Sequence, residues 1–334
     1  MRPLSLIALG LSALSTPAIC AEVNVYSLRQ PSLVQPLFDA FTAETGIVVN
    51  VAYVDKGMVE RLVSEGDRSP ADLVMTVDIA RLSQVVDAGV TQPVESKVLE
   101  ENIPAAFRDP GNQWFGLTTR GRIVYASKER VKDGEVTTYE DLANPKWKGR
   151  LCTRSGTHDY NLGLTAAMIA HHDAAFAKTW IEGLKANLAH KPEGNDSSQV
   201  KSIWAGECDI SLGNTYYLGQ MLANPEQKDW AESVRIIYPK FENGGTHLNV
   251  SGVAMTKAAP NKADALKLME FLSSDEAQKI YADINNEFPV KPGVERSELV
   301  KSWGDFTPDD VNLMDIAKLR GEALKLMEEV NFDG

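Results

Sequence analysis

Three tyrosines occur in two segments of the sequence that share the same construction. Residues 150–172 read RLCTRSGTHDYNLGLTAAMIAHH, and residues 207–223 read ECDISLGNTYYLGQMLA. In each segment a strand-like run leads through a glycine-containing corner into a predicted helix, whose first turn carries Tyr160 or the pair Tyr216 and Tyr217. Phenolate oxygen is a hard anionic donor that suits a small trivalent cation better than zinc, copper or calcium. The pattern therefore indicates a candidate metal site built from these three residues, the tyrosine cluster.

The surroundings of the tyrosines support this interpretation. Asp159 precedes the first tyrosine, and Asn214 and Thr215 precede the other two. These residue types cap helices by accepting hydrogen bonds from free backbone N–H groups. Ligands commonly bind at the carboxyl ends of strands in α/β sheets, and helix N-termini favour negative charge. We therefore expect the phenols to converge at a corner where loss of their protons is favoured.

Other interpretations of the same residues remain open. Tyrosines near helix starts also pack against a core, or stack on an organic ligand. Arg120 and Arg122, two residues apart on a predicted strand, share a face and could bind an anion, or could pair with some of the 46 acidic residues. His171 and His172 are adjacent on a predicted helix and cannot both clasp one ion, which argues against a soft-metal site.

Strand-like and helix-like runs alternate in the elements that must position these residues. In the first part, the predicted strands are 23–26, 47–54 and 72–76, and the predicted helices are 33–44, 58–65 and 79–88. After a strand-rich stretch at 113–127 come strands at 150–153, 209–212 and 248–255, with helices at 160–171, from 216, at 262–271, 275–284 and 308–330. This rhythm is typical of parallel, doubly wound sheets. It fits a split first lobe, an inserted second lobe and two crossing strands.

The N-terminus has the features of a secretory signal peptide. Arg2 is followed by an apolar run at 4–14 and by small residues up to Ala21, where we expect cleavage. No later stretch is long and apolar enough to cross a membrane, so we expect a soluble mature protein outside the cytoplasm. The formal charge of −12, or −13 after loss of Arg2, argues against nucleic acid or an anionic membrane as partner.

Two cysteines remain after the expected cleavage. Cys152 and Cys208 are predicted to form a disulfide in an oxidising compartment, the alternative being two unrelated buried thiols. Catalysis is not expected, because the chain has no nucleophile elbow, zinc-protease motif or phosphate loop. Cys152 also has no histidine partner that can be identified from the sequence.

At these residues the chain resembles the periplasmic ferric iron-binding proteins, the substrate-binding subunits of iron ABC importers. The resemblance covers nearly the whole mature chain and rests on the order of SPADLVMTVDIARL, QWFGLTTRGRIVYAS, CTRSGTHDYNLGL, GNTYYLGQM, HLNVSGVAM and FLSSDEAQ. It implies a two-lobed type II periplasmic binding protein, in which two doubly wound α/β domains are joined by a hinge with crossing strands, similar to one lobe of transferrin. We place the N-terminal lobe at 22–118 and 250–300, and the C-terminal lobe at 119–249 and 301–334.

The resemblance also implies a ligand and partners. Family members hold Fe³⁺ with tyrosines that match Tyr160, Tyr216 and Tyr217, and many add carbonate or bicarbonate as a synergistic anion near the arginine that matches Arg120. The expected partner is an inner-membrane ABC permease, and the protein is expected to be a periplasmic monomer. The alternative function is a binding protein for a small organic ion held by stacked tyrosines and arginine.

One departure from the family pattern concerns the first loop. Several relatives follow its Ser-x-Arg with His-Tyr, which supply first-lobe ligands, whereas here Arg29 is followed by Gln30 and Pro31. Gln30 is a poor ferric ligand and Pro31 offers no donor, so both fit equally a structural role at the next helix. We expect three tyrosines from one lobe, with carbonate or water completing the coordination. Tyr26, Arg29, Gln30 and Arg122 are candidates for lining the cleft.

Overall fold

The structure is a computed structural model that describes residues 21–54 and 56–334. The predicted signal peptide falls almost wholly outside these described residues. Within them, no helix has the length and apolar character needed to cross a membrane.

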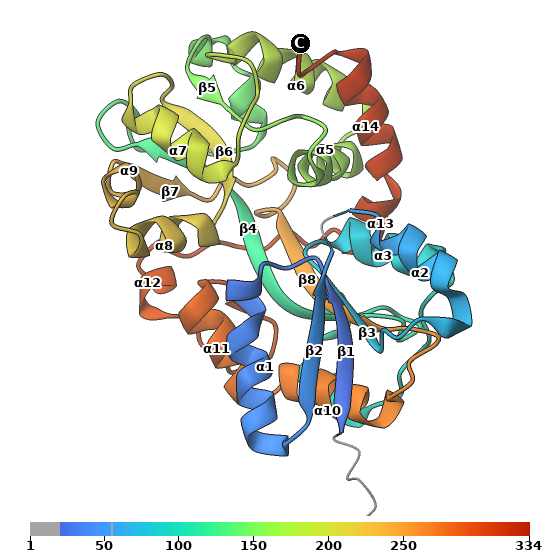
Figure 1. Ribbon diagram of the computed structural model, residues 1–334. Coiled ribbons are helices and arrows are strands. Elements are labelled where there is room, and N and C mark those ends of the chain that lie inside the picture. Colours follow the sequence, from blue (N-terminus) through green and yellow to red (C-terminus); the bar gives the residue numbers. More distant parts are fainter. Residues whose placement is uncertain (1–20, 55) are drawn as a thin grey trace, which may run out of the picture.

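A single mixed sheet runs through the molecule (Figure 1). Within the described ranges, its strands lie in the order β2-β1-β3-β8-β4-β6-β5, with β7 and β9 also paired to β4. The strands are β1 Glu22–Ser27, β2 Val48–Tyr53, β3 Leu73–Thr76, β4 Phe115–Ser127, β5 Leu151–Cys152, β6 Ile210–Asn214, β7 Val234–Ile237, β8 Leu248–Met255 and β9 Phe288–Pro289. The mixed α/β fold with two crossing strands agrees with the predicted fold class.

Strand β4 connects the two ends of the sheet. Its first half pairs antiparallel with β8, up to Gly121 opposite Leu248, and its second half pairs with β6, beginning at Arg122 opposite Asn214. Both β4 and β8 run between the lower and upper lobes in Figure 1. The change of partner therefore brings Arg122 beside the strand that leads to Tyr216.

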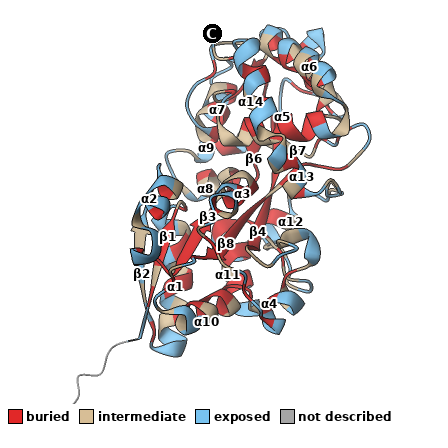
Figure 2. Cartoon of the chain, turned by 90° about the vertical axis from the view of Figure 1, so that its right-hand side faces the viewer, coloured by how far each residue is buried: buried red, intermediate tan, exposed pale blue. Residues whose placement is uncertain are grey.

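Helices cover both faces of the sheet, and buried residues fill the sheet and the inner helix faces (Figure 2). The α-helices are α1 Pro31–Thr45, α2 Met58–Glu65, α3 Ile79–Asp87, α4 Lys97–Asn102, α5 Asp159–His171, α6 Ala174–Asn187, α7 Asp196–Trp204, α8 Tyr216–Ala223, α9 Lys228–Glu232, α10 Lys262–Leu272, α11 Asp275–Asn285, α12 Glu298–Lys301, α13 Leu313–Lys318 and α14 Arg320–Glu329. Short 3₁₀ helices are η1 Gly66–Arg68, η2 Ala105–Phe107, η3 Glu140–Ala143 and η4 Pro145–Trp147.

Two large apolar clusters form the cores. One packs α1, α10 and α11 against β1 and β3 and includes Phe38 and Leu268; the other packs α5, α6 and α14 and includes Trp180 and Met327. Leu82 of α3 belongs to the second cluster, so α3 also packs against helices that follow much later in the chain. The exact lobe boundaries placed at 118 and 249 stay a prediction.

The prediction of one helix over 308–330 is wrong. The structure has two helices there, α13 and α14, joined at Leu319, which ends one and precedes the other. Residues before α13 are held outside a helix because Asp309 accepts a hydrogen bond from the backbone of Gly245 and contacts His171. Both helices pack on α5, but α13 also packs on α3 whereas α14 packs on α6.

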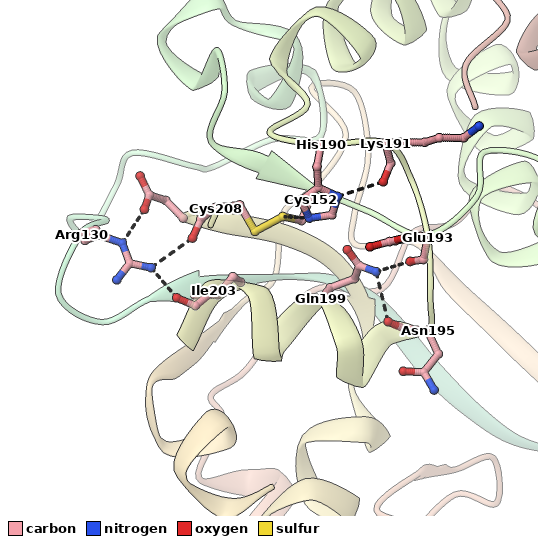
Figure 3. Close-up of a disulfide and its surroundings, with 10 residues drawn as sticks. Arg130, Cys152, His190, Lys191, Glu193, Asn195, Gln199, Ile203 and Cys208 are labelled. Atoms are coloured by element: carbon pink, nitrogen blue, oxygen red, sulfur yellow. Dashed lines mark hydrogen bonds and ion pairs between the residues drawn. A yellow bond between two sulfur atoms is a disulfide. The ribbon is translucent and has the colours of Figure 1, made fainter. Parts of the chain in front are cut away.

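The predicted disulfide between Cys152 and Cys208 is confirmed (Figure 3). It joins the end of β5 to the segment before β6 across a sequence separation of 56 residues. The structure shows a histidine neighbour of Cys152 that could not be identified from the sequence: Nε2 of His190 lies 3.2 Å from its Sγ. Since that sulfur is bonded to Cys208, the contact does not create a free nucleophile.

Breaking this disulfide is expected to lower the free energy of unfolding by about 4 kcal/mol, because the unfolded chain regains the freedom of a long loop. The measurement is urea unfolding of the wild type with and without reductant, beside the double variant Cys152→Ser/Cys208→Ser. Reductant should leave the double variant unchanged. An identical midpoint for reduced and oxidised wild type would show that the bridge carries no such stabilisation.

Candidate metal centre

Tyr160 lies in the first turn of α5, as predicted, but the residue that caps this helix differs from the prediction. The cap is His158, whose Nδ1 accepts a hydrogen bond from the backbone N–H of Tyr160 at 3.2 Å. Asp159 is instead the first helical residue, and its carboxylate pairs with Arg81 and Arg320. Burial, followed by the charge of Arg154, lowers the pKa of His158 to about 4, so its imidazole is neutral at pH 7.

Tyr216 and Tyr217 are the first two residues of α8, again in the predicted turn. Thr215 occupies the cap position, but its side chain accepts no hydrogen bond from the helix. Asn214 is not a cap either, because its Oδ1 accepts a hydrogen bond from Nη1 of Arg122 at 3.2 Å. These asparagine and threonine side chains therefore do not satisfy the N–H groups at the start of α8.

The corners at the starts of α5 and α8 bring the phenol groups together. The hydroxyl oxygens of Tyr160 and Tyr216 are 3.2 Å apart. The rings of Tyr216 and Tyr217 stack with centroids 4.4 Å apart and an interplanar angle of 26°. Adjacent side chains on a regular helix diverge by about 100°, so this stacking depends on the corner that precedes α8. The tyrosine cluster thus offers oxygen donors from two helix starts at one place.

Two of these phenols hold their protons more tightly than a free tyrosine, contrary to the expectation that the helix starts favour loss of those protons. Burial raises the pKa of Tyr216 well above its ordinary value, with further increases from the nearby phenols. Burial also raises the pKa of Tyr217 to about 12, with the charge of Asp196 as the next cause. A cation that binds the phenolate form must therefore displace the protons of both groups.

Three arginines surround the ring of Tyr160. The guanidinium carbons of Arg120, Arg122 and Arg154 lie 5.9, 5.8 and 5.1 Å from the ring centroid. Arg120 donates to Oγ of Ser251 at 2.8 Å, while its buried Nε has no partner among the described residues. The positive charges favour a negative phenolate or a bound anion at this place.

The guanidinium of Arg122 forms more hydrogen bonds than that of Arg120. It donates through Nη2 to Asn161 at 2.6 Å and through Nη1 to Asn214 and Asp196 at 3.2 and 3.1 Å. Arg122 therefore holds the strand end of β6 against α5, and of the two arginines on β4, Arg120 retains more capacity for an anion.

Asp196, at the start of α7, links the residues around the tyrosine cluster. Its side chain is fully buried and pairs with Arg122 and Arg154, each at 3.1 Å. It also accepts a hydrogen bond from the backbone N–H of Asn214 at 2.8 Å. Because Asn214 ends β6 two residues before Tyr216, the first residue of α8, Asp196 holds the corner from which Tyr216 and Tyr217 project.

The candidate cleft residues of the first loop have different positions. The hydroxyl of Tyr26 donates to the carboxylate of Glu65 at 2.9 Å, so it is occupied within its own lobe. Arg29 is buried and pairs with Glu287 at 2.5 Å, and its charge also interacts with Tyr216. Gln30 is exposed at the cap position of α1 and makes no side-chain capping bond.

A second polar contact lies beside the tyrosine cluster and joins α3 to α5. Arg81 binds the carboxylate of Asp159 through Nη2 at 2.7 Å and Nε at 2.9 Å. Arg320 of α14 binds the same carboxylate. A cavity of about 240 Å³ lies next to this contact and is lined by all three residues together with α2. The interaction connects segments that belong to the two predicted lobes.

Sequence reasoning missed Arg81, Arg154, His158 and Asp196. Arg154 and His158 lie within the segment that was singled out, so their proximity to Tyr160 was a usable signal. No local pattern distinguishes Asp196 from the other acidic residues, because its partners lie 18 to 74 residues away. Arg81 likewise meets Asp159 only through the tertiary fold.

Comparisons with known proteins match most of the chain. Residues 36–308 match the family model described as "Bacterial extracellular solute-binding protein". Iron uptake protein A1 of Synechocystis is 42% identical over 321 residues, covering 95% of this chain and 89% of the relative.

Two solved structures are also similar. The apo ferric ion-binding protein A of Pasteurella haemolytica has a TM-score of 0.91 and 53% identity, with 94% of this chain and 98% of that chain covered. A Trichodesmium protein in complex with iron and citrate has a TM-score of 0.88 and 42% identity, with 93% and 100% covered.

These matches extend over most of the described fold. They agree with the prediction that the chain is a binding protein and not an enzyme, because the matched family and the similar proteins bind solutes. The family also implies a location outside the cytoplasm. The chain therefore belongs to the bacterial extracellular solute-binding proteins.

Proposed function

We propose that this protein captures ferric iron in the periplasm and delivers it to an ABC permease. Iron is bound by the phenolates of Tyr160, Tyr216 and Tyr217, with a synergistic anion held near Arg120. The observation that carries the proposal is the meeting of the phenols, with the hydroxyls of Tyr160 and Tyr216 only 3.2 Å apart. Hard oxygen anions at one point are suited to a small trivalent cation.

The surrounding charges support this binding mode. Three phenolates balance the charge of Fe³⁺, while Arg120 and Arg154 add positive charge near Tyr160 that an anion would offset. The buried Nε of Arg120 has no partner in the described part of the chain and is suited to donate to carbonate or bicarbonate. Gln30 is exposed at a helix start, so we expect the anion or water to complete the coordination.

The names of similar proteins support iron as the cargo. They include an iron uptake protein and a ferric ion-binding protein. The Trichodesmium structure contains citrate as well as iron. The synergistic anion is therefore carbonate or a carboxylate such as citrate. Transport would follow from binding: hinge motion brings the lobes together around iron, and the permease recognises this form.

The test is a titration of iron-free protein with ferric citrate and bicarbonate, followed by removal of unbound iron. We expect one iron per chain and a visible absorption band, because ferric phenolates absorb by ligand-to-metal charge transfer. A protein that binds citrate without iron would stay colourless. That result would favour the alternative of an organic anion held by the tyrosines and arginines.

Iron retention is expected to fall steeply in acid. The pKa of Tyr217 is about 12 without metal, so iron must displace a proton that excess acid returns. Apparent affinity should fall by up to about tenfold per pH unit for each proton released on binding. Dialysis between pH 8 and pH 5, with iron content and circular dichroism as readouts, measures this effect. If the folded protein retained as much iron at pH 5 as at pH 8, the result would contradict phenolate ligation.

Weakening the contact between α3 and α5 is expected to speed iron release. Arg81→Gln removes the charge that binds Asp159, and a partly exposed pair of this kind contributes about 1 kcal/mol. Release to a competing chelator, followed by decay of the visible band, should then be about fivefold faster. Arg61→Gln is the matched control, because Arg61 forms its ion pair with Glu65 of the same helix and otherwise lies over the ring of Tyr26, away from α5. Equal release rates in Arg81→Gln and the wild type would exclude this role.

A further inference from the structure

A second group of metal-ligating side chains lies at the opposite end of α5 from Tyr160. It consists of Glu140 of η3, His172 directly after α5, and Glu242 in the turn before β8. One ligand atom from each residue lies within 4.8 Å of the others. We call these residues the carboxylate–histidine cluster. Three segments far apart in sequence thus present one imidazole and two carboxylates to the same point.

Contacts within this cluster leave one buried oxygen without a partner. Nε2 of His172 lies 2.7 Å from Oε1 of Glu140, and the backbone N–H of Glu242 donates to the same oxygen at 3.3 Å. The Glu140 side chain is only 8% exposed, and its Oε2 has no hydrogen-bond partner in the described structure. An unpaired buried carboxylate oxygen is costly, so a cation at this position would satisfy it.

Positive side chains do not neutralise these carboxylates. Within residues 21–54 and 56–334, neither Glu140 nor Glu242 forms an ion pair with a lysine or arginine, and the imidazole of His172 is the basic partner of Glu140. Two carboxylates brought together without a fixed cation repel each other unless a proton or metal ion lies between them.

The imidazole is also held in place. Its ring stacks on Phe176 with centroids 3.9 Å apart and an interplanar angle of 12°. The preceding His171 contacts Asp309 at 2.9 Å and stacks on Phe241, so it does not take part. The prediction that the two histidines cannot share an ion is consistent with this geometry, but His172 finds its companions on other segments.

We propose that the carboxylate–histidine cluster binds a divalent transition-metal ion. One imidazole nitrogen and two carboxylate oxygens suit ions such as Zn²⁺, with water filling the remaining positions. The ion lies between Nε2 of His172 and the carboxylates, where it replaces the contact between His172 and Glu140. Binding links η3, the end of α5 and the turn before β8, and so stabilises the lobe that carries the tyrosine cluster.

This site is separate from the tyrosine cluster. From Tyr160 to His172 the chain follows α5, which rises about 18 Å at ~1.5 Å per residue. Removing one site should therefore leave binding at the other intact. The two proposals can fail independently, because ferric iron at the phenolates is detected by colour and Zn²⁺ is colourless.

The experiment is equilibrium dialysis against Zn²⁺, with bound zinc measured by atomic emission. We expect one zinc per chain in the wild type and in Tyr216→Phe/Tyr217→Phe. His172→Ala should weaken zinc binding at least about tenfold, and Glu242→Gln by several-fold, since each removes a ligand. The control is His190→Ala, which removes a partly exposed imidazole that contacts the disulfide and, among the described residues, no carboxylate.

Two further measurements complete the test. Zn²⁺ should raise the melting temperature of the wild type but not that of His172→Ala, because only the folded state presents the site. The zinc-edge X-ray absorption spectrum should show nitrogen and oxygen neighbours without sulfur. Unchanged zinc binding in His172→Ala, or loss of zinc from the double tyrosine variant, would overturn the proposal. Glu242→Gln keeps the test valid if His172→Ala does not fold, because Glu242 is exposed.

Discussion

Tyr216→Phe is expected to bind ferric iron at least about 100-fold more weakly than the wild type and to lose most of the visible band. The substitution removes a ligand oxygen, whereas changes to residues that merely orient ligands already cost about 10- to 100-fold. The other two phenols cannot supply the missing ligand oxygen, because each projects from a different place. Tyr217 projects from the next residue of α8, and Tyr160 projects from α5. Competition with citrate for ferric iron measures the loss of affinity. Tyr160→Phe and Tyr217→Phe should weaken iron binding to a similar extent.

The fold should survive this substitution. Tyr216 shares one hydroxyl contact with Tyr160, so its loss changes the free energy of unfolding by only about 1 kcal/mol. Tyr238→Phe is the matched control, because the Tyr238 hydroxyl is buried and has no hydrogen-bond partner in the described residues. It should bind iron as the wild type does. Full iron content and colour in Tyr216→Phe would remove this residue from the coordination sphere.

Asp196→Ala is expected to lower the free energy of unfolding by about 3–5 kcal/mol. The side chain is fully buried between Arg122 and Arg154 and also accepts the N–H of Asn214. Its loss leaves two guanidinium groups short of a negative partner in a place that water reaches poorly. Because Asn214 lies two residues before the start of α8, the tyrosine corner should loosen and iron affinity should fall with stability.

Urea unfolding with circular dichroism measures the change. The matched control is Asp315→Ala, an exposed pair with Lys318 on the surface of α13, for which the expected change is below about 1 kcal/mol. Asp196→Asn separates charge from hydrogen bonding, since the amide oxygen can still accept from the backbone of Asn214. An unfolding midpoint unchanged in Asp196→Ala would show that the arginines find other partners.

Regular elements were predictable where local patterns were strong. Strand β8 and helix α2 match their predicted ranges to the residue, and α1 ends at Gly46, which adopts the left-handed conformation with φ of 73°. Alternation of apolar residues and a glycine stop are local signals. The single helix expected over 308–330 failed at its start, because Asp309 contacts Gly245 and His171, which are far away in sequence. It also failed at Leu319, where α13 ends and α14 begins.

The tyrosines that offer ligand oxygens could be predicted from the sequence, but the residues that hold them in place could not. Repetition of a strand, corner and tyrosine marked Tyr160 and Tyr216, and the structure brings their hydroxyls together. The assignment of Asp159 as a cap was wrong, because its carboxylate is drawn to Arg81 and Arg320. Residue type alone cannot decide between a helix N–H and a guanidinium that arrives from another element.

The disulfide and the carboxylate–histidine cluster show the same limit. Two cysteines in an exported chain have one possible pairing, so Cys152 and Cys208 could be assigned from number and compartment. The partners of His172 could not be assigned from the sequence, because Glu140 and Glu242 are 32 and 70 residues away along the chain. Chemistry that depends on distant partners becomes visible only once the fold is known.

The most direct test of the proposed function is a crystal structure of the iron-loaded protein with anomalous scattering measured at the iron absorption edge. The predicted result is one anomalous peak within bonding distance of the hydroxyl oxygens of Tyr160, Tyr216 and Tyr217. An anion should lie between that peak and Arg120. A peak located elsewhere, or tyrosines that contact an organic ligand with no iron present, would contradict the proposed ferric site.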